Sequence, residues 1–460
     1  METTATCTAM MLKPVYSSPH PLAGQKVPLT VFDRAGFDDF VPTVLAYHPS
    51  PSPPGNEALK AGLLRAVAAY PHLSGRLAAD DQGRRFLHLN DHGVLVVEAT
   101  VPANMAAVLA LAGGERWRGV TAAAAAHDHF RELYPPPPEE NAGAAVLQVK
   151  LSRFKCGGLI VGIISHHQVA DGHSMSSFLA RWAAIVRAAG GGKKADDVCA
   201  AAPPPFLDRA ATAVPRHPPA PVFDHRSVEF KGDGSRSYAV VPMDKIKNLK
   251  VSFTAEFVAE LKARVAARCS TFQCILAHVW KKVTAARGLQ LHPEEFTQVK
   301  VAVNCRSRAK PPVPAGFFGN MVLWAFPRLR VGDLLSSSYG GVVSAIRDAV
   351  ARVDGKYIQS FIDFGAVADT TSGGEMLAAA APAGGTVMCP DLEVDSWLGF
   401  QFHQTDLGAG PSCTFLAPGL PLDGLMIFVP SATAKGGVDL FIGLVEGHAE
   451  VFSKICYSLG

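Results

Sequence analysis

Residues 156–187 constrain the fold more than any other part of this sequence. The stretch CGGLIVGIIS is apolar and rich in β-branched residues, which is typical of a strand buried on both faces. From Ser174 onward, apolar residues recur at helical intervals, at Met175, Phe178, Leu179, Trp182, Ile185 and Val186. The sequence therefore predicts a buried strand followed by an amphipathic helix, with the polar stretch SHHQVADG (165–172) on the turn between them.

Helical and extended patterns interleave along the rest of the chain. Apolar residues recur at helical spacing in 57–69, after the capping residue Thr254, in the segment that ends at Gly288, and in 341–353. Alternation of apolar and polar residues predicts strands in 145–154 and 298–308, and a further strand is expected near 238–242. This interleaving predicts an α/β or α+β fold.

The chain is expected to form two lobes. Residues 188–224 are rich in Gly, Pro and Ala and show no sustained period, which is typical of a long crossover loop. We therefore predict an N-terminal lobe over 1–187 and a C-terminal lobe over 225–460.

Composition narrows the functional classes. Hydrophobic residues make up 48% of the 460 residues and charged residues 18%, so the chain can bury a large core. The net charge of +3 is scattered, which argues against a dedicated nucleic-acid binder. Nine cysteines without a C-x-x-C motif indicate free thiols in a reducing compartment. No secretory signal or membrane-spanning run is recognised, so we expect a soluble, cytoplasmic protein without a membrane partner.

His167 and Asp171 allow several interpretations. On a helix they would share one face, whereas on a turn the two side chains can point in different directions. A lone histidine in an apolar segment is more often a satisfied core residue than a catalyst. A metal site would use His166, His167, Asp171 and His173, but adjacent histidines after a strand point to opposite faces. The absence of a G-x-S-x-G motif weakens a serine-hydrolase interpretation.

Several motifs together resemble those of the BAHD acyltransferases, the plant acyl-CoA-dependent transferases. HHQVADG matches the family's H-x-x-x-D-G signature. Further segments are similar to family segments and stand in the family's order: YPHLSGRL (70–77), LAHVWKKVTAARGL (276–289), VNCRSR (303–308), GFFGNMV (316–322), SWLGFQFHQTDLGAG (396–410) and LVEGHAEVF (444–452). The resemblance spans nearly the whole chain. It implies a two-lobed, chloramphenicol-acetyltransferase-like α/β fold, in which each lobe is a mixed β-sheet flanked by helices.

One motif departs from the family pattern. The family's D-F-G-W-G is Asp406-Leu407-Gly408-Ala409-Gly410 in this chain, so both aromatic residues are missing. The resemblance implies a structural role for this motif, away from the reacting centre. Because Asp406, Gly408 and Gly410 are retained, we expect the fold to be preserved.

The resemblance also implies roles for individual residues. His167 would be the general base that takes a proton from the acceptor as it attacks a CoA thioester, with no acyl-enzyme intermediate. The indole N–H of Trp397 is a candidate donor to the oxyanion. Asp171 would turn away from the substrate and pair with an arginine of the second lobe. Arg306 and Arg308 lie two apart on a predicted strand and so on one face; we favour Arg306 as the partner.

Acyl-CoA is expected as a co-substrate, with no bound cofactor and no metal. The region that resembles the family's CoA-binding surface carries hydroxyls, helix N-termini and a lysine, which suit phosphate groups. Its candidate residues are Ser252, Thr254, Lys262, Ser270 and Thr271.

The acceptor site is expected to be acidic. Asp395 lies two residues before Trp397 and Glu393 two residues earlier, so strand alternation would place both carboxylates on the tryptophan's face. Carboxylates there would repel an acidic acceptor and attract a protonated amine. Residues 27–54 are similar to the cereal hydroxycinnamoyl amine transferases. Within them Thr43 and Leu45 match pocket positions, and Asp38 is a further acidic candidate.

We therefore predict a monomeric N-acyltransferase that forms phenolamides from a hydroxycinnamoyl- or benzoyl-CoA and an arylalkylamine, agmatine or a polyamine. Two alternatives stay open. One is an O-acyltransferase that esterifies an alcohol. The other is a catalytically silent relative that still binds CoA.

Overall fold

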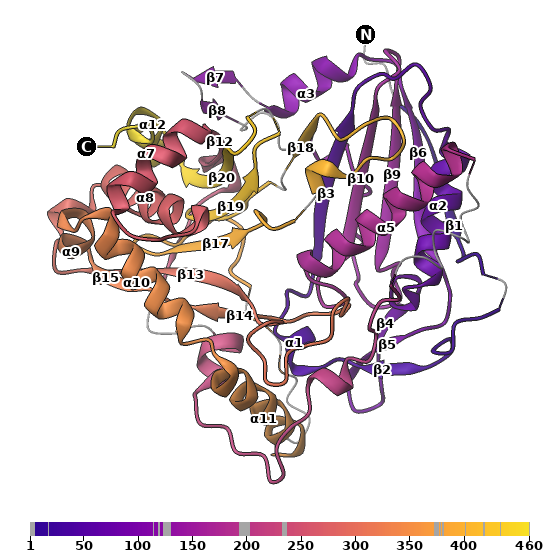
Figure 1. The fold of residues 1–460 in the computed structure, drawn as a ribbon, viewed down its shortest axis with the longest axis horizontal. Helices are drawn as coiled ribbons and strands as arrows, with labels where there is room; N and C mark the ends of the chain where they lie inside the picture. The colour runs from indigo at the N-terminus through magenta and orange to yellow at the C-terminus, as the bar shows by residue number, and fades with distance from the viewer. Residues whose placement is uncertain are drawn as a thin grey trace.

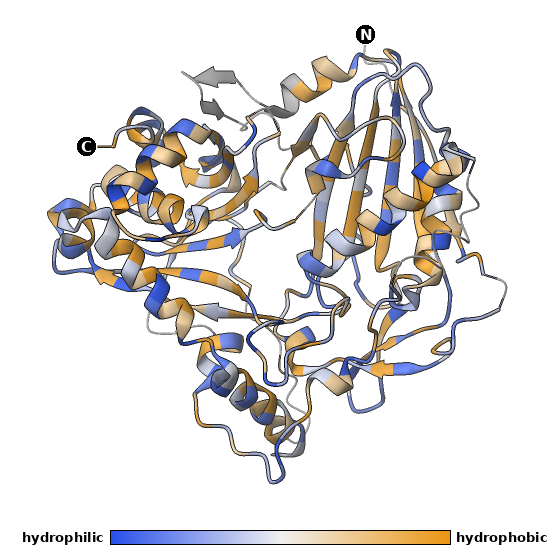
Figure 2. Cartoon of the chain, viewed as in Figure 1, coloured by the Kyte–Doolittle hydropathy of each residue, from blue (hydrophilic) through white to orange (hydrophobic). Residues whose placement is uncertain are grey.

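The chain folds around two β-sheets that lie side by side in the computed structural model (Figure 1). The structure describes residues 5–16, 18–113, 115–117, 120–122, 130–192, 203–231, 237–371, 377, 379, 381–400, 402–416, 419–432 and 434–459. We call the part around the six-stranded sheet the first lobe and the part around the nine-stranded sheet the second lobe. Figure 2 shows apolar residues concentrated on the strands of both sheets. Among the described residues, no helix is long and apolar enough to cross a bilayer.

The first lobe contains a mixed sheet with two helices on one face. Its strand order is β1 (Thr6–Leu12), β6 (Val94–Val101), β9 (Leu147–Phe154), β10 (Leu159–His166), β3 (Phe40–Tyr47) and β18 (Thr414–Leu416). Helices α2 (Asn56–Ala68) and α5 (Gly172–Gly190) pack against each other and against the sheet (Figure 1). The predicted strand–turn–helix at 156–187 is therefore present as β10 and α5.

Strand β10 is buried on both faces, which explains its uninterrupted apolar sequence. All eight of its residues are buried. Val161 and Ile163 pack in the core beneath α2 and α5. Ile160 and Ile164 belong to a separate cluster on the other face, which also contains Met105 of α3 (Met105–Gly113).

The second lobe is built on the longer sheet. Its strand order is β14 (Val322–Ala325), β13 (Phe296–Asn304), β17 (Leu392–Ser396), β19 (Leu425–Pro430), β20 (Val438–Val445), β12 (Ile246–Phe253), β8 (Val120–Ala122) and β7 (Glu115–Trp117), and β15 (Arg328–Arg330) also pairs with β13. Helices gather on one side of this sheet (Figure 1): α7 (Ala255–Val265), α8 (Thr271–Ala286), α9 (Val331–Ser336), α10 (Tyr339–Ala351) and α12 (Glu446–Ile455). Trp280 of α8 is fully buried in this core and donates to the Thr297 hydroxyl at 3.0 Å.

Smaller elements complete the fold. The minor strands are β2 (Lys26–Pro28), β5 (Arg85–His88) and β4 (Arg76–Ala79) in one sheet, and β11 (Ala239–Val240) and β16 (Thr386–Val387) in another. Helix α1 (Val31–Arg34) contacts α11 (Gly355–Thr371). Short 3₁₀ segments are η1 (Pro71–Ser74), η2 (Ala210–Thr212), η4 (Met243–Lys245), η5 (Leu289–Leu291) and η6 (Phe402–Gln404), and η3 (Arg226–Lys231) is a π-helix.

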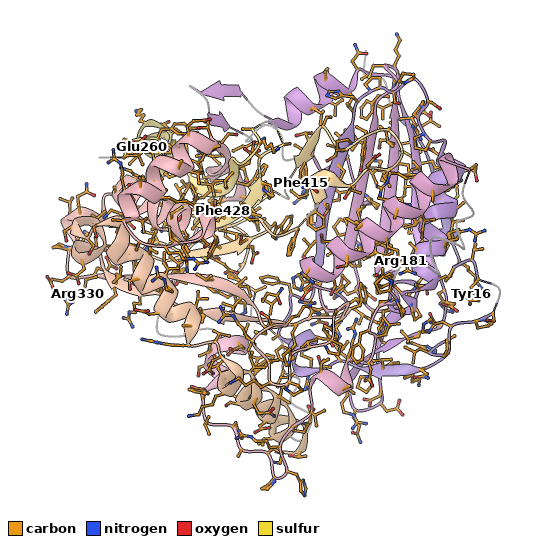
Figure 3. All side chains as sticks on the ribbon, in the orientation of Figure 1. Tyr16, Arg181, Glu260, Arg330, Phe415 and Phe428 are labelled. Atoms are coloured by element: carbon orange, nitrogen blue, oxygen red, sulfur yellow. The ribbon has the colours of Figure 1, made fainter. Side chains whose placement is uncertain are left out.

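The two lobes exchange strands. β18, from the C-terminal part of the chain, pairs with β3 of the first lobe, with Phe415 opposite Leu45. β7 and β8, from the N-terminal part, join the second sheet next to β12. Figure 3 shows Phe415 at the junction between the lobes. The lobes are thus not two uninterrupted segments, and the boundaries at 187 and 224 remain a prediction.

Candidate active site

His167 lies on the turn between β10 and α5. His166, the last residue of β10, is fully buried, with its ring 5.0 Å from that of Phe40 and its Nε2 3.2 Å from Asp38. His173 packs near Phe400 instead, with 6.4 Å between ring centroids. The four candidate metal ligands therefore point to different surroundings. Among the described residues, no three His, Cys, Asp or Glu side chains form a group that could hold a metal ion.

The His167 ring is partly buried against the loop before β3. Its centroid is 5.8 Å from that of Phe37 in an edge-on arrangement. A Cβ at Gly36 would lie 3.0 Å from Nδ1, so a glycine allows the loop to approach the ring closely. Nδ1 is buried and has no hydrogen-bond partner among the described residues. Burial lowers the pKa of His167, although the charge of Asp171 acts in the opposite direction. The imidazole is therefore neutral at pH 7 and able to accept a proton.

Asp171 forms a buried ion pair across the lobes. Its two carboxylate oxygens accept hydrogen bonds from the Arg306 guanidinium at 2.8 and 2.9 Å, and the side chains are 2% and 11% exposed. Asp171 is also the N-cap of α5, accepting from the Ser174 amide at 2.9 Å, and it accepts from the Met321 amide at 3.0 Å. Burial alone would raise the pKa of Asp171, but Arg306 and the two amides hold that pKa below its usual value. Asp171 is thus a brace for the turn.

A second set of contacts holds the backbone of the turn, and not all of its residues are predicted from the sequence. The side-chain amide of Asn320 donates to the carbonyl oxygen of His167 at 2.9 Å and to the Asp33 carboxylate at 3.0 Å. Arg209 donates to Asp33 at 3.0 Å and to the carbonyl of Val169. Asn320 lies in the recognised GFFGNMV segment. Asp33 and Arg209 carry no sequence signal that distinguishes them from surface charges, because their burial arises only from tertiary packing.

Arg308 does not share a face with Arg306, so that expectation was wrong. β13 ends at Asn304, and the following residues form a turn in which the Arg308 amide donates to the Cys305 carbonyl at 2.9 Å. The Arg308 guanidinium instead donates to carbonyls at the C-terminal end of α10, Val350 at 3.0 Å and Val353 at 3.2 Å. The guanidinium therefore lies at a helix end.

The altered DLGAG motif forms a loop closed by its aspartate. Asp406 accepts hydrogen bonds from the amides of Gly408 at 2.8 Å and Gly410 at 2.9 Å. Both glycines have positive φ, 94° and 89°, which explains why they are retained. Leu407 is 1% exposed and fills the core of the first lobe. The arginine at this loop is Arg187, which donates to the Asp406 carbonyl at 2.7 Å.

The acidic candidates Glu393 and Asp395 lie on the face of the second sheet that is turned toward the first lobe. Their strand neighbours Leu392 and Val394 pack in the second-lobe core, and alternation directs the carboxylates to the opposite face. We call this the interlobe face; it carries Lys300, Glu393, Asp395 and the following Trp397. The residues of β19 on the same face, Ile427 and Val429, belong to the first-lobe core.

The two carboxylates are not equivalent. Glu393 is 4% exposed and pairs with Lys300 at 3.1 Å. Asp395 is partly exposed, and its carboxylate has no hydrogen bond or ion pair to any residue that the structure describes, whereas its backbone belongs to the β17–β19 ladder. Burial, aided by the nearby charge of Glu393 and opposed by Lys300, raises the pKa of Asp395 to about 7. Of the two carboxylates predicted on this face, Glu393 is thus paired with a cation and Asp395 is not.

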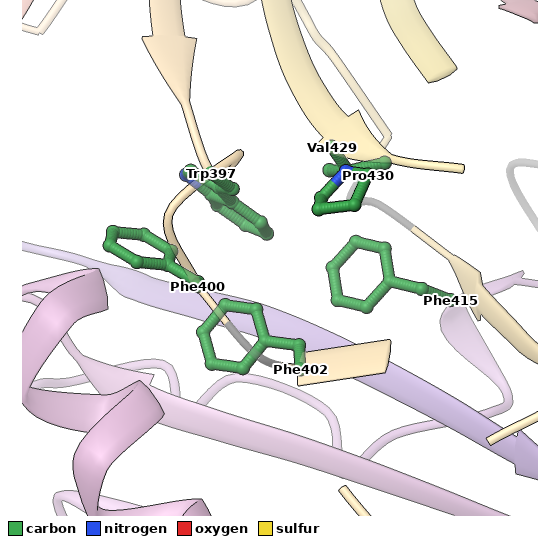
Figure 4. Close-up of a pocket in the computed structure, with 6 residues that line it drawn as sticks. All are labelled: Trp397, Phe400, Phe402, Phe415, Val429 and Pro430. Atoms are coloured by element: carbon green, nitrogen blue, oxygen red, sulfur yellow. The ribbon is translucent and has the colours of Figure 1, made fainter. Parts of the chain in front are cut away.

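An aromatic pocket adjoins Trp397 at the lobe junction (Figure 4). It encloses about 190 Å³ including its open mouth and is lined by Trp397, Phe400, Phe402, Phe415, Val429 and Pro430. Phe400 also covers the start of α5, where a Cβ at Gly172 would lie 2.6 Å from its ring. The absence of a side chain at Gly172, the glycine of the H-x-x-x-D-G motif, therefore leaves space for the Phe400 ring.

The other pocket candidates differ in position. Thr43 and Leu45 lie on β3 and are 9% and 1% exposed, and Leu45 is paired with Phe415 of the pocket. Asp38 was expected in the acceptor pocket, but its carboxylate is engaged by His166, by Arg85 at 2.5 Å and by Asn141 at 3.1 Å. The adjacent His166 ring, together with the hydrogen bonds from Arg85 and Asn141, holds the pKa of Asp38 well below its usual range. These contacts make Asp38 a brace of the first lobe.

The CoA candidates form two groups at opposite ends of α7. Lys262 donates to the Thr271 hydroxyl at 2.8 Å, next to Ser270, which caps α8. Thr254 caps the start of α7, close to Ser252 at the end of β12. Only the group at the N-terminus of α8 combines a lysine, two hydroxyls and a helix N-terminus, which suits a phosphate.

Comparisons with known proteins agree with this architecture. The model of the Transferase family matches residues 7–459. Tryptamine benzoyltransferase 1 of Oryza sativa subsp. japonica is 58% identical, covering 98% of this chain and 97% of that protein. Agmatine coumaroyltransferase-1 of Hordeum vulgare is 37% identical, covering 94% and 93%.

Solved structures show the same fold. Vinorine synthase superposes with a TM-score of 0.70 at 20% identity, covering 97% of this chain and 96% of that one. F. graminearum TRI101, solved with coenzyme A and T-2 mycotoxin, gives a TM-score of 0.70 at 16% identity, covering 93% and 96%. The predicted two-lobed α/β fold is confirmed.

The buried Asp171–Arg306 pair predicts that substituting Arg306 lowers the free energy of unfolding more than substituting Arg308. Arg306→Met leaves the buried Asp171 carboxylate without its cation, so the free energy of unfolding should fall by about 3–5 kcal/mol. Arg308→Met removes only hydrogen bonds to two backbone carbonyls at and just after the end of α10 and should cost about 1 kcal/mol. Urea unfolding of the two variants at pH 7 measures both. Equal losses would contradict the assignment of the brace.

Asp395 should reduce stability at neutral pH. Its pKa is raised in the folded chain, so its ionised form is disfavoured and stability is lost as pH rises from its unfolded pKa toward 7. Asp395→Asn should therefore stabilise the fold by up to about 4 kcal/mol at pH 8 and by less at pH 5. Glu393→Gln, which leaves Lys300 unpaired, should destabilise. Unfolding midpoints at both pH values test this, and a pH-independent difference for Asp395→Asn would refute it.

Proposed function

Because this chain belongs to the Transferase family, that of the BAHD acyltransferases, we propose that it moves a benzoyl or hydroxycinnamoyl group from a CoA thioester to an amine. The product would be a phenolamide. Relatives with 58% and 56% identity are named tryptamine benzoyltransferase 1 and tryptamine hydroxycinnamoyltransferase 2, which supports this donor class and an arylalkylamine acceptor. We also propose a cytosolic monomer.

The observation that supports an amine acceptor most directly is the unpaired carboxylate of Asp395. It lies on the interlobe face, two residues before Trp397 and beside the aromatic pocket. An ionised carboxylate there attracts an ammonium group and repels an acidic acceptor. The pocket offers aromatic and apolar surface for an aryl substituent of the same molecule.

His167 supplies the base. The amine nitrogen attacks the thioester carbonyl carbon while imidazole takes a proton from that nitrogen, and the Trp397 indole N–H would donate to the oxyanion. When the C–S bond breaks, the proton passes to the CoA sulfur. Because the buried Nδ1 faces Gly36, Nε2 is the atom we assign to this transfer. CoA phosphates would bind at Lys262, Ser270 and Thr271.

The protonated amine must lose one proton to solvent before it reacts, in addition to the proton that His167 takes during the attack. With a pKa of about 10, its deprotonation at pH 7 costs roughly 4 kcal/mol. The lowered pKa of His167 means that the base is already neutral in this range. The acceptor's ionisation, rather than that of the enzyme, should then control the rate above neutrality.

A panel of amines and alcohols with benzoyl- and coumaroyl-CoA tests the proposed reaction. We expect amides from arylalkylamines, identified by product mass, and a loss of about 10²–10⁴-fold in kcat for His167→Ala. Exclusive ester formation would favour an O-acyltransferase. If the wild type bound CoA but turned over none of the acceptors, a silent relative would be indicated.

The pH profile tests the order of proton transfers. With an amine acceptor, kcat/KM should rise between pH 7 and 9, because the neutral amine fraction rises about tenfold per unit. The KM for the amine should increase below pH 7 as Asp395 becomes protonated, and Asp395→Asn should remove that change. A flat profile above pH 7 would contradict limiting deprotonation of the amine.

A further inference from the structure

Lys300 lies on the interlobe face beside Glu393. It lies on β13, next to β17, and its Cα is paired with that of Glu393 in the parallel ladder. Its ammonium is 3.1 Å from the Glu393 carboxylate and 3.9 Å from the centroid of the Trp324 ring. It is also 5.8 Å from the ring of Phe37, the same ring that contacts His167. The Phe37 ring is thus a neighbour of both Lys300 and His167.

The position of Lys300 sets the charge of the acceptor site. Two carboxylates, Glu393 and Asp395, project from alternate positions of β17 onto one face. Lys300 neutralises the first of them, and the Lys300 and Glu393 side chains are 25% and 5% exposed. The second carboxylate has no cation of its own among the described residues. One positive charge on a bound molecule would therefore neutralise the remaining carboxylate, that of Asp395.

The surroundings of Asp395 offer no other described charge. Its neighbour strand β19 presents Leu425, Ile427 and Val429 on the same face. On its own strand the facing charge is Glu393, and on β13 it is Lys300, the two charges that act on its ionisation. Beyond Trp397 the lining is aromatic. A second cation on a bound molecule would meet either an apolar wall or the Lys300 ammonium.

We propose that Lys300 is a specificity-determining residue that takes the place of a second substrate ammonium and so restricts the acceptor to amines with a single positive charge. The inference rests on the proposed N-acyltransferase function and deepens it. A monoamine with an aryl group pairs with Asp395 and packs against the aromatic pocket. A diamine or a guanidino amine brings a second cation toward Lys300, where like charges repel.

Lys300→Met is the direct test. Removing the ammonium frees Glu393 and creates a site with two carboxylates. The ratio of kcat/KM for putrescine or agmatine to that for tryptamine should rise at least tenfold, equivalent to about 1.4 kcal/mol. Wild-type preference for the diamine, or an unchanged ratio in Lys300→Met, would overturn the proposal.

A second substitution separates charge from packing. In Lys300→Met/Glu393→Gln the site again has one carboxylate, so the ratio should return toward the wild-type value. Lys300→Arg keeps the cation and should retain the preference for the monoamine. Failure of the double variant to reverse the shift would show that packing, not charge, governs the ratio.

Two further comparisons keep the test interpretable. Lys247→Met is a matched control, since Lys247 is also 25% exposed and pairs with a glutamate, Glu446 at 3.4 Å, but lies on β12; it should leave the ratio unchanged. If Lys300→Met does not fold, Glu393→Gln alone replaces it, and a raised KM for tryptamine is expected because Lys300 is then unpaired. An unchanged KM in Glu393→Gln would also reject the proposal. A wild-type chain that forms no amide would instead contradict the proposed function.

Discussion

The Asp171–Arg306 pair is the interaction on which the arrangement of the site depends. It joins the first turn of α5 to a turn of the second lobe, and both carboxylate oxygens are occupied by the guanidinium. A buried pair of this kind adds little net stability compared with apolar packing, but breaking it leaves a charge without compensation. Its function here is geometric. The pair fixes the turn that carries His167 and holds it against the second lobe, while Asn320 holds the His167 carbonyl.

On the interlobe face, by contrast, one charged side chain lowers the stability of the fold. Asp395 is held in surroundings that disfavour its ionised form, and its strand neighbour Glu393 increases that effect. A fold optimised for stability alone would place an apolar residue or a cation there. Such unfavourable electrostatics are characteristic of binding and catalytic sites. Asp395 lies beside Trp397 and the aromatic pocket, where an ionised carboxylate can bind a cationic acceptor. We therefore attribute the cost of ionising Asp395 to acceptor binding.

Local periodicity in the sequence was sufficient to predict the elements around the site. The uninterrupted apolar run predicted β10, and helical spacing predicted α5. Arg306 was predicted as the partner of Asp171 from its position in the family motif, not from residue spacing. The separate expectation that Arg306 and Arg308 share a strand face was wrong, because β13 ends at Asn304.

What the sequence could not provide was pairing between distant segments. β18 is three residues long and carries no periodic signal, yet it completes the first sheet. Glu393 meets Lys300 only because β13 and β17 are parallel neighbours, which residue spacing does not show. Asp38 was misplaced for the same reason, since its partners Arg85 and Asn141 come from other parts of the first lobe.

The position of the amine in a structure of this chain bound to CoA and tryptamine, which cannot react without an acyl group, is the decisive measurement. We expect the amine nitrogen within about 3.2 Å of His167 Nε2. We also expect that this nitrogen, as an ammonium, faces Asp395, that the indole lies against Trp397, and that the Asp171–Arg306 pair is intact. A complex in which the amine binds elsewhere, with the His167 ring sealed from both ligands, would contradict this mechanism.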